Sequence, residues 1–429
     1  MKPRGNIKCF DELKGYIDEL TVIDTHDHSA GYGPDADDAI EFIISGYFRC
    51  DVRSASNDKT VELLIDKNVP LEKRWPVFEK IWNRTKYTGY GLVTRLMLKR
   101  FYGLDDLTFD GIKKIQETNL QLSDPKISES ILDEMKIEVR LANIACDIEK
   151  IINKTYKLPA RARLVIGLPA YHSIKSYSEI QAIAKPLGKI VTSLDEYVVI
   201  CKEIFTAYRD FGAVAFKDQS AYQRKIDYSN PTKSQAEEIF NWIMANPRRV
   251  ANYPEQTKPL DDWLFHQFMR IAREFDLPVQ IHTGILTWNY NDIRNANAIN
   301  LRSLIELHKD VRFDIFHANW PYAEELIYLG KNYPNVYIDF CWANIIDPVY
   351  CQRMFKQILS AVPHGKIHGY GSDYEGQWLA QAWAHLKIAK DNIAIALAEM
   401  IDMQYIDIGD AKEIAKNWLY DNPKEFFKL

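Results

Sequence analysis

Eight short apolar runs, separated by amphipathic stretches, constrain the fold of this 429-residue chain more than any other feature. Each run is hydrophobic at successive positions, which is typical of parallel strands covered on both faces by helices. We predict strands at 21–27, 137–144, 162–169, 213–218, 278–284, 312–318, 336–342 and 366–372. Eight units of strand and helix close most naturally into a (β/α)8 barrel.

Residues of the metal-ligand type separate the barrel from its main alternative, an open doubly wound sheet. His26 and His28 end the first run, and His282, His317 and Asp373 follow the fifth, sixth and eighth. In an open sheet these strand ends would spread along a row at ~4.8 Å per strand, too far apart for one ion. A barrel gathers them around one mouth. The Gly-rich turn expected after the first strand of a doubly wound sheet is also missing.

The first of these groups is a His-Asp-His triplet in the run VIDTHDH. Side chains alternate along a strand, so His26 and His28 face the same side while Asp27 faces away. Imidazole and carboxylate ligands suit Zn, Mn, Fe or Ni better than Ca. A bare His-x-His is often just a pair of loop histidines. With the later residues added, we predict one divalent ion or two, zinc first, on His26, His28, His282 and Asp373.

Composition excludes several classes of function. The 54 basic and 59 acidic residues leave a formal charge of -5, and no basic tract suggests a nucleic-acid surface. Six cysteines without a Cys-x-x-Cys pair predict reduced thiols in a cytoplasmic protein. No secretory signal begins the chain, and no uncharged apolar run approaches the ~20 residues that span a bilayer. We therefore expect a small-molecule substrate, no nucleic-acid or membrane partner, and a monomer or a homo-oligomer.

Two segments interrupt the alternation of strands and helices. Residues 33–136 show helical patterns but no convincing strand, so a mostly helical insertion is predicted after the first strand, as a lid over the barrel mouth. Trp75, Trp82 and Tyr87 are expected in the core of this insertion. A second interruption, at 219–260, predicts a helix and a long loop. The whole chain, 1–429, is predicted to form a single domain.

Several further side chains could carry chemistry. Lys217 ends the fourth strand, where a nearby ion would repel its ammonium group. It must then lose its proton, carry a carbamate, or reach a substrate anion, unless it only packs on the rim. Asp373 could be ligand, base or both. His317 could bind the metal or polarise a substrate carbonyl, and His172, just past the third strand, is a further candidate for the mouth.

The complete pattern resembles the amidohydrolase superfamily. The matching features are His-x-His after strand one, a lysine after four, histidines after five and six, and an aspartate after eight. Within that superfamily three segments resemble the branch of amidohydrolase-related proteins that includes nodulin-like domains fused to glutamine synthetase. These are AFKDQSAYQR, HTGILTWNYND and HANWPYAEELIYLGKNYPNVYIDF. The resemblance implies one or two divalent ions, and hydrolysis of C–N, C–O or P–O bonds, with some decarboxylases and isomerases.

A second resemblance is to uronate isomerases of the same superfamily. The segment YFRCDVRS is similar to their Tyr-x-x-Arg-Ala-Met-Arg-Ser, with Tyr47, Arg53 and Ser54 in register. Two features depart from that family. His317 is present here although uronate isomerases lack the strand-six histidine, and Tyr374-Glu375 follows Asp373 where they have Ser-Arg. The missing arginine puts binding of a uronate carboxylate in doubt.

Three functions follow, in descending order. The first is a metal-dependent hydrolase that acts on a small carboxylated or sugar-derived substrate through metal-activated water. Asp373 would move the proton, His317 or the ion would stabilise the oxyanion, and Lys217 and Arg53 would bind substrate. The second is an isomerase of the uronate type, or a decarboxylase; in the isomerase Tyr47 and Asp373 would move protons. The third, a binding module without catalysis, would be expected to lack a ligand residue, and none is missing.

Overall fold

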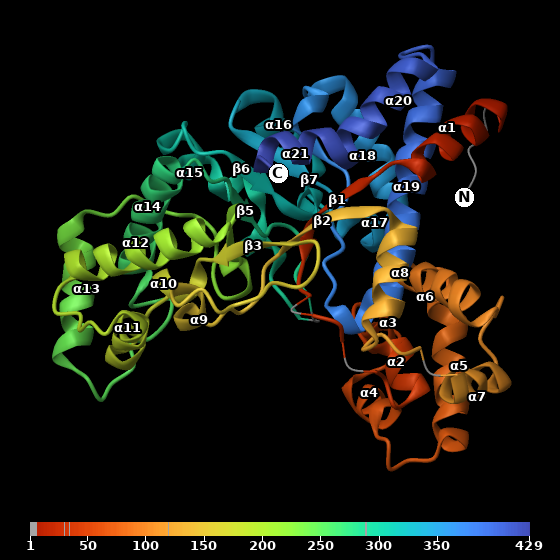
Figure 1. Cartoon of the computed structure of the whole chain (residues 1–429), viewed down its shortest axis with the longest axis horizontal. Coiled ribbons are helices and arrows are strands. Elements are labelled where there is room, and N and C mark those ends of the chain that lie inside the picture. Colours follow the sequence, from red (N-terminus) through yellow and green to blue (C-terminus); the bar gives the residue numbers. More distant parts are fainter. Residues whose placement is uncertain (1–6, 30, 34, 119, 288–289) are drawn as a thin grey trace. The chain divides into compact units, whose positions relative to one another are not determined.

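The computed structural model describes residues 7–29, 31–33, 35–118, 120–287 and 290–429 (Figure 1). Its strands form an eight-stranded sheet in chain order, from β1 to β8. Strands β3 to β7 pair in parallel, with Phe216 opposite Val279 and Val279 opposite Phe313. The strand order and the helices between strands confirm the predicted (β/α)8 barrel.

Every strand lies inside its predicted range, but most are shorter. They are β1 Val22–Asp27, β2 Ile137–Ala142, β3 Ala162–Gly167, β4 Ala215–Asp218, β5 Val279–Ile281, β6 Phe313–Ile315, β7 Val336–Asp339 and β8 Ile367–His368. As a result His282, His317 and Asp373 lie in the segments that follow strands, rather than in the strands themselves.

The chain divides into two compact units. Unit 1 comprises 1–140, 287–291 and 340–423, and unit 2 comprises 141–286, 292–339 and 424–429. The expectation of one domain over 1–429 stays a prediction.

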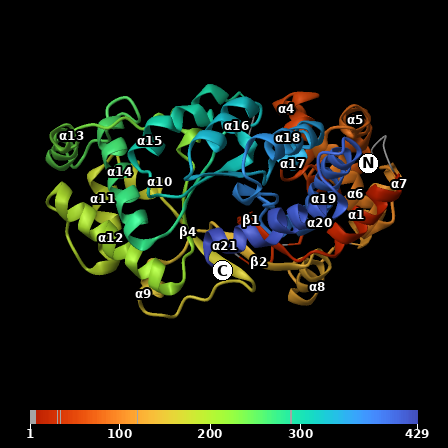
Figure 2. The ribbon, with the colours of Figure 1, turned by 90° about the horizontal axis from the view of Figure 1, so that it is seen from above.

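Unit 1 holds the helices from α1 to α8 and from α17 to α20. They are α1 Ile7–Glu19, α2 Ala39–Ile44, α3 Phe48–Ser54, α4 Asp58–Ile65, α5 Leu71–Thr85, α6 Gly89–Met97, α7 Phe109–Thr118, α8 Pro125–Met135, α17 Ala343–Ile346, α18 Pro348–Ala361, α19 Leu379–Asp402 and α20 Ile408–Lys416. Most residues of helix α19 are buried, because α1, α6, α8, α18 and α20 pack around it. Figures 1 and 2 both show α1, at the red end of the colour scale, beside the blue α19 and α20.

Unit 2 holds the helices between β2 and β7. They are α9 Ile148–Ile152, α10 Pro169–His172, α11 Tyr177–Ala184, α12 Leu194–Phe211, α13 Lys233–Ala245, α14 Lys258–Phe275, α15 Arg302–Leu307 and α16 Ala323–Asn332; the chain ends with α21 Asn422–Phe427. Local sequence sets their limits, as in α12. There the Ser193 side chain caps the first turn, and Gly212 ends the helix with a φ of 106° that suits glycine.

The two interruptions have the predicted secondary structure. Within the described residues of 33–136 every regular element is helical, from α2 to α8. Trp75 and Trp82 are buried as expected, whereas Tyr87 is 76% exposed, so its placement in the core was wrong. The second interruption contains helix α13 between two loops. The role of the first as a lid stays a prediction. In the described part of the chain no helix is long and apolar enough to cross a membrane.

Candidate functional site

Strand β1 delivers two histidines to one place, as the alternation of side chains predicts. All six of its residues are buried, His26 lies near its end, and His28 follows it. Asp27 points elsewhere, because its carboxylate pairs with Nη1 of Arg140 at 3.2 Å. The strand therefore separates two imidazoles from the carboxylate between them.

Asp373 completes what we call the ligand cluster, His26, His28 and Asp373. Its Oδ1 lies 3.0 Å from Nε2 of His26 and 3.1 Å from Nε2 of His28. The two Nε2 atoms are 3.0 Å apart. His26 and Asp373 are buried, while the His28 side chain is 30% exposed, so solvent reaches the cluster on the His28 side.

The backbone around Asp373 is held from several elements. Asp373 has a φ of 57°, a left-handed conformation uncommon for a residue with a side chain. Its N–H donates to the His26 carbonyl at 2.6 Å, and the Ser372 N–H donates to Oδ1 of Asp24 at 2.8 Å. These bonds fasten the segment after β8 to β1.

Three successive carbonyl oxygens of that segment also have partners. His385 of α19 lies with Nδ1 3.0 Å from the Ser372 oxygen. Tyr47 donates its hydroxyl to the Asp373 oxygen at 2.5 Å, and the His28 N–H donates to the Tyr374 oxygen at 3.2 Å. The orientation of the Asp373 carboxylate is thus fixed from both sides of the residue.

Two aromatic side chains pack against the ring of Tyr47. The Tyr47 ring stacks on Trp342 at a centroid distance of 4.4 Å and lies 5.1 Å from Tyr374. Trp342 and His385 were missed by sequence reasoning. Trp342 follows a strand end, as the predicted site residues do, which could have marked it. His385 sits inside a helix without any such signal.

Arg53, the predicted anion partner, lies in α3 with its Nε 2.5 Å from Oδ1 of Asp58. Its nearer acidic neighbour in sequence, Asp51, instead accepts a hydrogen bond from Thr88 at 2.5 Å. Burial raises the pKa of Asp51 to about 6. Substrate binding by Arg53 stays a prediction.

In unit 2 the two later histidines contact each other. Nε2 of His317 lies 3.0 Å from Nδ1 of His282, and Nε2 of His282 lies 2.7 Å from the Ile285 carbonyl oxygen. Since a carbonyl only accepts, His282 donates there through Nε2. The ring of Tyr222, in the turn Ser220–Tyr222 after β4, lies 4.7 Å from that of His282. Metal binding by His282 stays a prediction.

Lys217 is 1% exposed, and its amine lies 5.3 Å from the centre of the Phe316 ring. A charged ammonium is attracted to the face of an aromatic ring, so this setting suits a protonated amine. Sequence reasoning missed Tyr222 as a neighbour of His282, although Tyr222 lies in the segment AFKDQSAYQR that begins at Ala215.

His172 is not a residue of an open mouth. Its ring is fully buried between the carboxylates of Asp218 and Asp261, at 3.2 Å and 2.5 Å.

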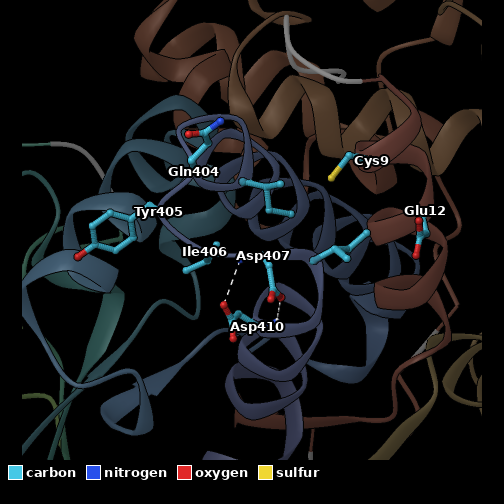
Figure 3. A pocket seen from close by; sticks show the side chains of 9 residues that line it. Cys9, Glu12, Gln404, Tyr405, Ile406, Asp407 and Asp410 are labelled. Carbon is cyan, nitrogen blue, oxygen red and sulfur yellow. Dashed lines mark hydrogen bonds between the residues drawn. The ribbon is translucent and has the colours of Figure 1, made fainter.

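A hollow of unit 1 lies away from the ligand cluster. A pocket of about 660 Å³ is lined by residues of α1, of the end of α19 and of the start of α20 (Figure 3). Its acids are engaged: Glu12 pairs with Lys412 at 2.7 Å, and Asp407 and Asp410 cap α20 reciprocally. Helix α19 follows Asp373 and is ~36 Å long, so this pocket lies at the far end of that helix from the ligand cluster.

The ligand cluster fits a divalent ion. Ligand atoms ~2.1 Å from one ion lie about 3.0 Å apart at right angles, as in octahedral coordination, and about 3.4 Å apart at the tetrahedral angle. The three atoms here are 3.0 Å, 3.0 Å and 3.1 Å apart. Two imidazoles and a carboxylate are also the donor set that Zn, Mn and Fe accept.

A family model described as Amidohydrolase matches residues 245–429. Protein fluG of Emericella nidulans is 32% identical over 283 residues, which are 62% of this chain and 30% of that protein. The chain thus spans less than a third of fluG. Uronate isomerase of Thermotoga neapolitana is 19% identical over 465 residues, 99% of this chain and 97% of the isomerase.

Among solved structures, glucuronate isomerase of Caulobacter crescentus matches with a TM-score of 0.77 and 16% identity, covering 98% of this chain and 94% of that one. At that identity the likeness concerns the fold alone. The family model over residues 245–429 and the end-to-end match to a uronate isomerase together support an amidohydrolase superfamily member.

Proposed function

We propose that the chain is a metal-dependent hydrolase that acts on a small polar substrate, carboxylated or sugar-derived. The observation that carries the proposal is the convergence of His26, His28 and Asp373 within 3.1 Å of one another. With both Nε2 atoms unprotonated, two imidazole lone pairs and a carboxylate at this separation repel one another, and a divalent ion between them turns that repulsion into attraction. The partial exposure of His28 gives an ion and a substrate a route to the cluster.

A divalent ion held there supplies a Lewis acid and lowers the pKa of bound water toward ~7. The residues of the chain do the rest. His26 and His28 fix the position of the ion, and Asp373 takes the proton of the attacking water. The bonds to the Ser372 and Asp373 backbone hold that carboxylate in place, so little reorganisation is needed during the reaction.

Lys217 bears on the number of ions. A carbamate on Lys217 would supply the anionic oxygens that bridge two ions, whereas an amine would face the oxygens of the substrate. The ring of Phe316 beside the amine favours the protonated amine, and hence one ion per chain. His317 and Arg53 are proposed to contact the substrate, and His282 remains the fourth predicted ligand.

An isomerase of the uronate type is the second candidate. It is supported by the match to uronate isomerase over 99% of the chain and by Tyr47, Arg53 and Ser54 in the register of that family. In such a reaction Tyr47 and Asp373 would move protons between neighbouring carbons. The residues Tyr374-Glu375 after Asp373 weigh against it, because a uronate isomerase has Ser-Arg there.

The decisive experiment combines metal analysis with a substrate panel. We expect about one Zn, Mn or Fe per chain, and metal-dependent hydrolysis of a lactone or an N-acyl compound from a panel that also contains hexuronates. Conversion of a hexuronate to its keto isomer, without hydrolysis of any other substrate, would establish the second candidate instead. In Arg53→Met the KM of a carboxylated substrate should rise; an unchanged KM would remove Arg53 from the site. Purified active protein without bound metal would refute both the hydrolase and the isomerase.

A further inference from the structure

The strongest feature outside the ligand cluster is a buried set of charges in unit 2. We call it the carboxylate–histidine network; its members are His172, Asp218, Asp261, Asp262 and Arg224. All five are at most 3% exposed. His172 ends α10 after β3, Asp218 ends β4, Arg224 follows β4, and Asp261 and Asp262 lie near the start of α14.

His172 lies at the centre of the network. Its Nδ1 is 2.5 Å from Oδ1 of Asp261, and its Nε2 is 3.2 Å from Oδ1 of Asp218. A neutral imidazole carries one N–H and one lone pair, so it would turn a lone pair toward one of the two carboxylates. Only an imidazolium donates to both.

The groups around these carboxylates balance their charge. Arg224 donates to Asp262 at 2.6 Å and has its Nε 3.2 Å from Asp261. Lys258 reaches Asp262 at 2.5 Å. With His172 protonated, three carboxylates face three cations, which is the condition for burying charges at all.

Neutral groups complete the surroundings of His172. Tyr253 donates its hydroxyl to Asp261 at 2.9 Å, Tyr228 donates to Asp218 at 2.5 Å, and Ser173 Oγ lies 3.3 Å from Nδ1 of His172. Phe265 presents its ring edge-on to the imidazole at 5.2 Å. Burial alone lowers the pKa of His172, but the charge of Asp261 and the hydrogen bonds to both carboxylates raise it to about 9.

The network also reaches the predicted site residues of unit 2. Asp218 follows Lys217 on β4, and its carbonyl accepts the N–H of His282 at 2.9 Å. Its carboxylate holds Ser220 at 2.7 Å, in the turn that brings Tyr222 against His282. Farther along, Asp262 holds Ser229 at 2.6 Å. The imidazolium of His172 therefore holds Asp218 at one end of the segment 218–229. At the other end Ser229 is held by Asp262, whose charge is balanced by Arg224 and Lys258.

We propose that His172 is a permanent imidazolium at neutral pH and the positioning residue that holds the end of β4 and the segment 218–229, and with them Lys217 and Tyr222, in place. The proposal rests on the proposed function only for its effect on turnover. The charge state and the ordering of the segment are properties of the fold.

Imidazole NMR of the full-length, zinc-loaded chain with labelled histidine tests the charge. We expect one histidine to remain protonated at pH 7 and to titrate at about 9, with its signal missing in His172→Gln. Asp261→Asn, which retains the shape but removes a charge, should lower that value. His364→Gln is the matched control, because the contacts of His364 are with Asn417, Trp418 and Asn422, away from the network. A signal of His172 that titrates at or below its ordinary value of 6.5 would overturn the proposal.

Hydrogen exchange and kinetics test the positioning. Exchange of 218–229 should be faster in His172→Gln than in wild type or His364→Gln, with metal content unchanged. On a substrate found by the panel, kcat should fall roughly 10- to 100-fold while KM changes little, since small misplacements are that costly. Unchanged exchange would overturn the positioning role. Altered exchange together with a silent substrate panel would leave His172 as proposed and refute the proposed function instead.

Discussion

Two clusters in this protein are built from the same side chains in opposite proportions. The ligand cluster of unit 1 sets two imidazoles against one carboxylate, whereas the network of unit 2 sets one imidazole between two carboxylates. In the network, protons on His172 satisfy both acids. In the ligand cluster, two ring nitrogens face each other 3.0 Å apart, and a divalent ion satisfies all three groups at once.

The two clusters also differ in the solvent exposure of their histidines. His172 is fully buried, so its charge is sealed in when the chain folds. His28 is 30% exposed, which leaves the ligand cluster open to an ion from solution. The ratio of imidazole to carboxylate and the access of solvent together distinguish a structural histidine from a candidate metal ligand. Sequence proximity to a strand end does not, because the buried His172 and the candidate ligand His28 both follow a strand.

The largest effect should come from removing a ligand. His26→Ala is expected to reduce bound metal from about one per chain to near zero and activity by more than about 100-fold, since even residues that only support a metal ligand cost 10- to 100-fold. Elemental analysis and turnover measure it, with His364→Gln as control. Full metal content in His26→Ala would erase the distinction between the two clusters.

Next in size is the loss of a carboxylate from the network. Asp261→Ala leaves His172 and Arg224 short of a counter-charge, so the free energy of unfolding should fall by about 3–5 kcal/mol. Denaturant unfolding measures this. Glu203→Gln removes a carboxylate from an exposed pair with Lys189 and should cost at most about 1 kcal/mol. Equal losses in both variants would mean that the buried charges are not interdependent.

The network should also make the protein sensitive to alkali. The pKa of His172 is raised from 6.5 to about 9, so the folded state keeps a proton up to a higher pH than the unfolded state does. Its contribution is complete below pH 6.5 and is lost as pH rises through 9, by about 3 kcal/mol. The free energy of unfolding should decline over that window in wild type, and much less in His172→Gln. Parallel curves for the two proteins would contradict a charged His172.

Sequence patterns predicted the strands well because parallel strands covered on both faces must be apolar throughout. They predicted the ligand cluster because β1 alternates regularly up to His26 and His28. The later residues are presented differently. His317, Ala318 and Asn319 all have positive φ, near 62°, 48° and 51°, and Asp373 has 57°. Such backbone is rare outside glycine and follows from distant partners, so no local pattern encodes it.

The partners of these bends show why sequence could not find them. The Asn319 side chain accepts from the Ala298 N–H at 2.8 Å and donates to the Tyr322 oxygen at 2.8 Å. His172 was noticed for its position after β3, but its two carboxylates lie 46 and 89 residues further along the chain. A role that depends on such separations becomes visible only in the folded chain.

The smallest effect is expected in Tyr47→Phe, which tests whether Tyr47 only orients the backbone of Asp373 or also transfers a proton. The Tyr47 hydroxyl donates to the Asp373 carbonyl at 2.5 Å, so it orients the backbone of a ligand. A neutral hydrogen bond is worth about 1 kcal/mol, and its loss should lower kcat about fivefold, with metal content and the pH profile unchanged. A proton-transfer role, as the isomerase candidate requires, would cost 100-fold or more. Turnover and metal content, measured on the same preparation, separate the two. A loss of 100-fold with full metal would assign Tyr47 to catalysis and favour the isomerase.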